Sequence, residues 1–190
     1  MTYPRTAPAH PPFPAVGPLG RFAAVMCFVV AIGGALAELA LAWVWLSPSL
    51  VETLVAPRIG LAAGVAALDG GTRLVGFAVS MLPLSVLLYA LHQAYKLFDA
   101  YRLGNVFTLD APVRLRRIGQ SMLALAVLRP LTATLLGLVL TASAPPGQRI
   151  LAIGISIDDY MIAVFGGLIL AIGHVMVEAA RLAEDNRQIV

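Results

Sequence analysis

The chain has 190 residues, of which 59% are hydrophobic and 12% are charged, and its formal net charge is +3. A soluble domain carries about 25% charged residues. Half of that supply cannot cover a water-facing surface, so an ordinary soluble globule is excluded. A collagen-like chain is excluded because glycine has no regular period, and a disulfide scaffold because Cys27 is the single cysteine. The composition therefore indicates an all-α integral membrane protein.

The first predicted element is a tail over residues 1–20, which contains six prolines and little apolar bulk. Proline blocks helix formation, so we predict that this tail is disordered. Four apolar runs follow, each near or above the ~20 residues that cross the hydrocarbon core of a bilayer. Backbone amides in lipid must be paired within their own segment, so the runs are predicted to be helices. We predict a four-helix transmembrane domain over 21–183 and a tail over 184–190, with spans at about 22–46, 74–98, 118–142 and 157–182.

Two alternatives to this topology are considered. The runs could be the buried helices of a soluble bundle, but such helices have polar faces, and these are apolar nearly all round. The first run also resembles a secretory signal peptide, because Arg21 precedes it and Ala35-Leu36-Ala37 has the small residues of a cleavage site. The run continues past that site to Leu46, which favours a span.

Orientation is predicted from the basic residues. Four spans place the two tails and the 99–117 loop on one side of the membrane, and Lys and Arg accumulate on the cytoplasmic side. Both termini are therefore predicted on the cytoplasmic side of the bacterial inner membrane. Nine basic residues lie on that side, and three lie on the other: Arg5, Arg21, Lys96, Arg102, Arg114, Arg116, Arg117, Arg181 and Arg187 against Arg58, Arg73 and Arg149. The positive charge therefore needs no nucleic-acid partner, and the expected partner is the lipid bilayer.

The larger outer connection covers residues 47–73. Its segments 50–56 and 59–68 are apolar enough for a short helix that lies in the membrane interface. Two roles are predicted for this connection, a cap packed over the bundle or a ligand-binding segment. In the other outer loop, Pro145-Pro146-Gly147 predicts a turn.

A basic hairpin is predicted between the second and third spans. The second helix should end near Gly104-Asn105, and Thr108 or Asp110 can cap the next helix. We predict that this hairpin is the working surface, with Arg102, Gly104, Phe107, Thr108, Arg114, Arg116 and Arg117. The acidic tail could fold back on it through Glu184, Asp185 and Asn186, and a partner could compete for that contact.

These segments resemble a known family. Gly104-Asn-Val-Phe-Thr108 followed by Arg114-Leu-Arg-Arg-Ile-Gly119, together with the tail from Glu178 to Val190, is similar to the bacterial domain of unknown function 2975 family. The resemblance covers about residues 20–190 and implies four transmembrane helices, with no established chemistry. This chain departs from it at Asn105 and Leu109, where more charged residues are expected. Many relatives are encoded beside a small helix-turn-helix regulator, so the resemblance implies such a protein as a cytoplasmic partner.

Charged residues within the spans are costly and are candidate functional groups. Arg129 lies near the middle of the third span, and Glu38 lies in the first span at a depth that differs by about 7–8 Å. The first interpretation is a buried Glu38–Arg129 ion pair that fixes the helix arrangement. The alternatives are a substrate or proton path and the absence of any pairing between the two residues. Pro130 frees the Ala126 carbonyl, which Arg129 or a neighbouring helix can satisfy.

Several other polar groups of the spans are candidates for ligand binding. His92 and His174 are placed at similar depth, which would permit haem ligation, although ordinary hydrogen bonds are the simpler reading. His174 and Glu178 are four residues apart and are too few for a metal site. Asp158-Asp159 suit a helix N-terminus, with a cation site as the alternative. Gly33-Gly34 and Gly166-Gly167 would permit close helix contact.

Catalytic motifs are not found in the sequence. It contains no phosphate-binding loop, no H-E-x-x-H, no C-x-x-C and no G-x-S-x-G. We therefore predict no catalytic residue, no metal and no cofactor. The predicted function is that of a non-enzymatic regulatory or interaction protein, with a homo-oligomer left open. The alternative is a small transporter or channel subunit that uses Glu38 and Arg129.

Overall fold

The computed structural model describes residues 17–61, 68–104, 110–142 and 154–187, and over these ranges the chain is helical without a strand. Four long helices dominate: α1 (Pro18–Leu46), α3 (Gly70–Arg102), α4 (Asp110–Leu140) and α5 (Ile157–Arg187). Each is long and apolar enough to cross a membrane. In the most apolar window of α1 only 11% of residues are buried within the molecule, which suits a surface that faces lipid. The predicted all-α fold with four spans is confirmed.

The helix boundaries extend the predicted spans. α1 begins at Pro18, inside the predicted tail, because proline fits the first turn of a helix, where its missing N–H is not needed. The rest of the predicted tail, residues 1–16, lies outside the described residues, as does the Pro145-Pro146-Gly147 turn. α5 continues to Arg187, so residues 184–187 of the predicted tail are helical.

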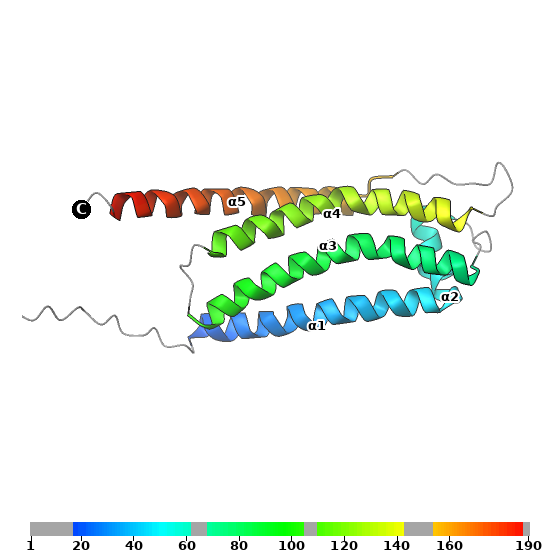
Figure 1. Ribbon diagram of the computed structural model, residues 1–190, viewed down its shortest axis with the longest axis horizontal. Helices are drawn as coiled ribbons and strands as arrows, with labels where there is room; N and C mark the ends of the chain where they lie inside the picture. The colour runs from blue at the N-terminus through cyan, green and yellow to red at the C-terminus, as the bar shows by residue number, and fades with distance from the viewer. Residues whose placement is uncertain (1–16, 62–67, 105–109, 143–153, 188–190) are drawn as a thin grey trace, which may run out of the picture.

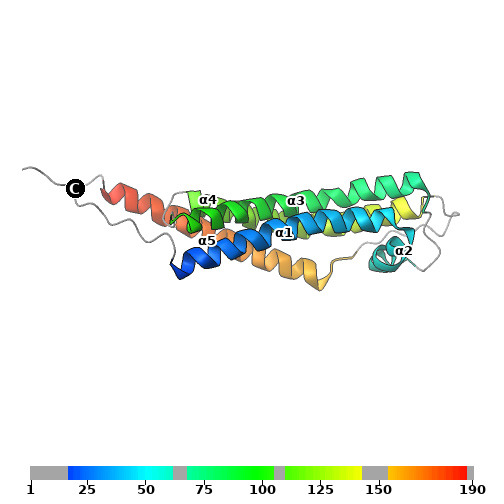
Figure 2. The same cartoon turned by 90° about the horizontal axis from the view of Figure 1, so that it is seen from below.

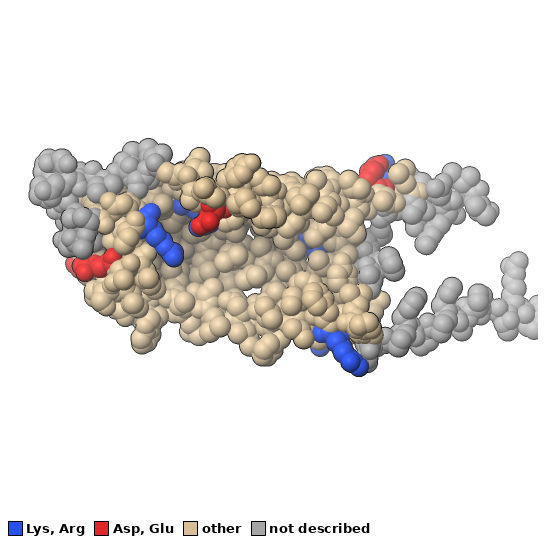
Figure 3. Space-filling model, turned by 180° about the vertical axis from the view of Figure 1, so that it is seen from behind, with Lys and Arg blue, Asp and Glu red and all other residues tan. Residues whose placement is uncertain are grey.

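The long helices form an open row rather than a closed bundle. α1 contacts α3, α3 contacts α4 and α4 contacts α5, whereas α1 contacts neither α4 nor α5 within the described ranges. Figure 1 shows α1 and α5 on either side of the middle helices, and Figure 2 shows parts of both below α3, so the row is curved. Figure 3 shows the hollow of this curve. We call this hollow the groove: α1 and α5 form its walls, and α3 and α4 form its floor.

The molecule has two ends, which we call the terminal end and the cap end. The terminal end carries Pro18, the α3–α4 connection and Arg187, and the cap end carries the segment between α1 and α3 together with Leu140. At the terminal end, α3 stops because Gly104 takes a left-handed φ of 79°, and its N–H donates to the Tyr101 carbonyl at 3.1 Å.

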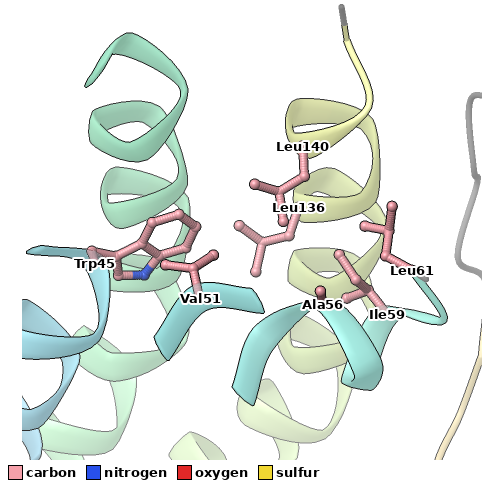
Figure 4. Close-up of a cluster of buried hydrophobic side chains, with 7 residues drawn as sticks. All are labelled: Trp45, Val51, Ala56, Ile59, Leu61, Leu136 and Leu140. Carbon is pink, nitrogen blue, oxygen red and sulfur yellow. The ribbon is translucent and has the colours of Figure 1, made fainter. Parts of the chain in front are cut away.

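The cap is a chain segment packed on the long helices. It comprises the short helix α2 (Pro48–Leu50), the π-helix η1 (Val51–Val55) and the 3-10 helix η2 (Ala56–Ile59). Its apolar side chains join α1 and α4 in a cluster shown in Figure 4: Trp45, Val51, Ala56, Ile59, Leu61, Leu136 and Leu140. Of the two predictions for this connection, the packed cap is therefore correct over residues 48–61, while 62–67 lie outside the described residues.

α1 and α3 are joined tightly at the cap end. Trp45 is 3% exposed, and its Nε1 donates to Ser80 Oγ at 3.2 Å. Arg73 donates from Nε to the Trp45 carbonyl and from Nη2 to the Leu46 carbonyl, both at 3.0 Å. These carbonyls end α1 without an intrahelical partner, so Arg73 caps the helix. Trp45 is therefore a core residue, whereas Trp43 is exposed.

Candidate functional site

A polar site lies at the groove between α4 and α5. Arg129 Nη1 of α4 is 3.2 Å from Asp159 Oδ1 of α5. The Asp159 side chain is 7% exposed, whereas the Arg129 side chain is 40% exposed. Asp159 Oδ1 accepts no well-aligned hydrogen bond from the described residues, despite its short distance to Arg129. The contact is therefore an ion pair with unused hydrogen-bonding capacity, because the guanidinium has five N–H donors.

Asp159 is held by the first turn of its own helix. Its Oδ2 accepts hydrogen bonds from the Ser156 backbone N–H at 3.0 Å and from Ser156 Oγ at 2.7 Å. In return, the Asp159 N–H donates to Ser156 Oγ at 3.1 Å. This reciprocal arrangement is a capping box in which aspartate takes the place of glutamate. The carboxylate therefore has a fixed position before it meets Arg129.

Glycines set the height at which α5 meets α4. A Cβ on Gly119 would lie 2.6 Å from the Leu170 backbone nitrogen, and a Cβ on Gly173 would lie 2.9 Å from the Arg116 backbone nitrogen. Gly166 is equally close to Met122, with 2.8 Å to its Cβ. Missing side chains let the two backbones approach, as is common between transmembrane helices. These contacts and the Arg129–Asp159 pair share one antiparallel register.

This register displaces α5 toward the terminal end. Residue 157 would lie opposite residue 142 if the predicted spans were aligned, but Asp159 lies opposite Arg129. The difference is about 16 Å, or three helical turns. Figure 1 shows the result: α5 begins partway along α4 and extends past it at the other end.

The predicted Glu38–Arg129 pair is wrong. The two residues do share a height, because each lies seven residues before a member of the cap cluster, Trp45 and Leu136. Glu38 is exposed, however, and α1 does not contact α4, so the row keeps the two residues apart. Among the described residues Arg129 pairs with Asp159 instead. Sequence reasoning placed Asp159 at the membrane surface because it assumed that each span begins there.

The other predicted ligand groups are not brought together. His92 and His174 lie on α3 and α5, which do not contact each other, so the arrangement does not support bis-histidine haem ligation. His174 Nδ1 lies 2.9 Å from the Leu170 carbonyl, the local hydrogen bond expected of a helical histidine. Among the described residues no three His, Cys, Asp or Glu side chains gather as a metal site. Asp158-Asp159 do open α5, as predicted.

The predicted basic hairpin is partly described. Arg102 Nη2 binds Asp99 Oδ1 at 2.7 Å, and Arg114 Nη2 is 4.0 Å from Asp110 Oδ2. Arg117 is exposed, whereas the backbone of Arg116 packs against Gly173. Phe107 and Thr108 lie outside the described residues. Arg102 and Arg114 thus each lie beside an aspartate three or four residues earlier on the same helix.

The predicted acidic tail segment is helical. Glu184, Asp185 and Asn186 belong to α5, which extends past the start of α4 in Figure 1. The contact predicted between this segment and the hairpin stays a prediction, because hairpin residues 105–109 also lie outside the described residues. The side chains of these three residues lie outside the described part of the structure.

A second hollow, apolar and about 320 Å³ in volume, lies at the cap end between α1 and α3. Ala42, Leu46, Leu74 and Phe77 contribute to its lining. Arg73 also lines it, but two of its nitrogens already donate to the carbonyls that end α1. This hollow is suited to apolar chains and offers no set of converging polar groups.

These features define a multi-pass α-helical membrane protein with an ion pair between two of its spans. The chain belongs to the family described as "Protein of unknown function (DUF2975)", which matches residues 3–190 and so nearly the whole chain. The predicted family resemblance is confirmed. No curated protein and no solved structure matches the chain.

Proposed function

We propose that the protein is a non-enzymatic regulatory or interaction protein that binds another protein at its terminal end. The observation that supports this is a surplus of free positive charge there. Arg102 and Arg114 are neutralised by neighbouring aspartates. Four other cations at this end are exposed and have no acidic partner among the described side chains: Arg21, Lys96, Arg117 and Arg181.

The same charges support an orientation with the terminal end in the cytoplasm and the protein in the inner membrane. Cytoplasmic segments of membrane proteins are enriched in Lys and Arg. At the cap end the described cations are Arg58 and Arg73, and the latter is engaged by backbone carbonyls. This difference in positive charge between the two ends is the signal that determines which side of a membrane protein faces the cytoplasm.

The proposed partner presents an acidic surface, and the family resemblance suggests a helix-turn-helix regulator. Exposed arginines beside a membrane also attract anionic headgroups. A protein contact must therefore be distinguished from a lipid contact. The predicted homo-oligomer stays a prediction, as does the absence of a direct nucleic-acid contact.

The test is recovery of partners by chemical crosslinking in cells followed by purification in detergent. The informative variant is Arg117→Glu combined with Arg181→Glu, because neither residue is paired and neither packs against a glycine. Arg58→Glu is the matched control, since it changes an exposed cation at the cap end. We expect one or more proteins to be recovered with wild type and with the control, and about tenfold less with the double variant, as for the loss of charged interface contacts. Equal recovery with all three chains would reject the proposal.

A small transporter or channel subunit is the second candidate. It is favoured by the Arg129–Asp159 pair, since ionisable residues within spans mark ion and proton pathways. The test is proton flux into proteoliposomes that contain a pH-sensitive dye. Flux above that of empty liposomes, lost in Asp159→Asn and kept in Glu38→Gln, would support this candidate. Flux equal to that of empty liposomes would reject proton transport.

A further inference from the structure

The inference concerns the first turn of α5 and does not depend on the binding surface at the terminal end. α4 continues for eleven residues beyond Arg129, which is about 16 Å. α5 begins only two residues before Asp159. The start of α5 and the non-helical residues 154–156 therefore lie at a height where α1, α3 and α4 are still apolar helices.

This segment exposes polar groups that hydrocarbon cannot satisfy. Residues 154–156 are exposed and non-helical, and the backbone N–H groups of Ile157 and Asp158 have no acceptor among the described residues. The Asp158 carboxylate is exposed beside them. Irregular backbone at membrane depth occurs only where it is buried in protein or lines a water-filled space. Residues 154–156 are exposed on the described part of the chain, so they are not buried within it.

A buried polar atom provides a second, independent indication. The Asp159 side chain is 7% exposed, and its Oδ1 faces Arg129 without a hydrogen bond from the described residues. Arg129 itself is 40% exposed, so part of its guanidinium is open to the surroundings. A carboxylate oxygen and a guanidinium that are held close but are not fully hydrogen-bonded are satisfied by water.

We propose that water enters from the cap end to about the middle of the molecule and that the Arg129–Asp159 pair is the polar site at which this path ends. The ligand of the site is water, hydrogen-bonded to the Asp159 carboxylate and the Arg129 guanidinium. Figure 3 shows charged side chains of both signs at the cap-end side of the hollow, in line with a hydrated region.

The test is the accessibility of single cysteines to a membrane-impermeant, charged methanethiosulfonate reagent in sealed vesicles of both orientations. The background is Cys27→Ala, since Cys27 is the only native cysteine. The reporters are Ile155→Cys and Asp158→Cys. Glu52→Cys in the exposed part of the cap identifies the side from which reagent reaches the cap end.

Two variants serve as matched controls. Leu131→Cys lies two residues from Arg129, and Leu39→Cys lies next to Glu38, so both have nearly the height of the reporters. Both leucines are exposed on the molecule and therefore face lipid if the groove path is the only route for water. A thiol in hydrocarbon stays protonated, and the thiolate is the reactive form.

We expect both reporters to react from the same side as Glu52→Cys and about a hundredfold faster than the two controls, because the thiolate fraction falls tenfold for each unit by which pKa rises. If Asp158→Cys fails to insert, Ile155→Cys alone carries the test, because Ile155 has no polar side chain to lose. Reporters as slow as Leu131→Cys would overturn the proposal. Reaction only from the side opposite Glu52→Cys would overturn the direction of water entry.

Discussion

The indole ring of Trp45 occupies the space that a side chain at position 76 would need. A Cβ built on Gly76 overlaps the six-membered part of the Trp45 ring, which is held in place by the hydrogen bond from Nε1 to Ser80 Oγ. The ring also belongs to the apolar cluster that fixes the cap. Gly76 is thus required by packing and not by its backbone angles, which are helical.

The first prediction follows from this contact. Gly76→Ala should destabilise the protein by about 1 to 3 kcal/mol, because overpacking forces the ring out of its position. Unfolding can be followed with a thiol-reactive fluorescent dye, since Cys27 is buried in the folded chain. Gly33→Ala is the control, as nothing lies within 4 Å of a Cβ there. It should be neutral or slightly stabilising, because alanine is the better helix former.

The second prediction tests the register of α5. Gly166→Val should weaken the α4–α5 contact by about 1 to 3 kcal/mol, since its Cβ would lie 2.8 Å from Met122 Cβ. Gly167→Val is the control on the next residue, where a Cβ meets open space. The same dye assay in detergent measures both. Equal melting temperatures for the two variants would mean that α5 does not pack on α4 through Gly166.

The third prediction compares the contributions of Asp159 and Glu38 to stability. Asp159→Asn and Arg129→Leu should each destabilise the protein by about 1 to 2 kcal/mol, which is below the cost of breaking a fully buried pair because Arg129 is partly exposed. The double variant should lose less stability than the two single variants lose together, because the two residues share one interaction. Glu38→Gln should leave stability unchanged, and a coupling between Glu38 and Arg129 in the same cycle would contradict the structure.

The fourth prediction concerns a buried amide. Gln93 on α3 is 5% exposed, and its Oε1 has no hydrogen-bond partner among the described residues. Gln93→Met keeps the length of the side chain and removes the unsatisfied oxygen, so it should raise stability by about 1 kcal/mol. Gln120→Met, at an exposed position on α4, is the control and should have little effect. Lower stability for Gln93→Met would indicate that the amide has a partner in the membrane.

Much of this architecture was accessible from the sequence because lipid imposes a simple rule. Unpaired backbone groups are costly in hydrocarbon, so each long apolar run must be a helix, and four runs give four spans. Helix ends could also be predicted from the sequence where residues at the end itself determine them, as at Gly104 and at Asp158-Asp159. The family, which matches residues 3–190, was also suggested by short segments of the sequence at Gly104–Thr108 and Arg114–Gly119.

The candidate site was not accessible in the same way. Glu38 and Arg129 were recognised as costly residues, but the partner of Arg129 depends on which helices touch and at what height. Those depend on Gly119, Gly166 and Gly173, whose missing side chains allow α5 to meet α4 about three turns from the aligned position. Hydropathy is nearly uniform along each span and contains no information on this register. The sequence by itself thus determined that the chain is a set of transmembrane helices, because that follows from solvation of the backbone. Only the tertiary structure decided that Asp159 lies beside Arg129 and that Glu38 stands apart, because side-chain volumes at the α4–α5 contact choose one alignment among many that are equally apolar.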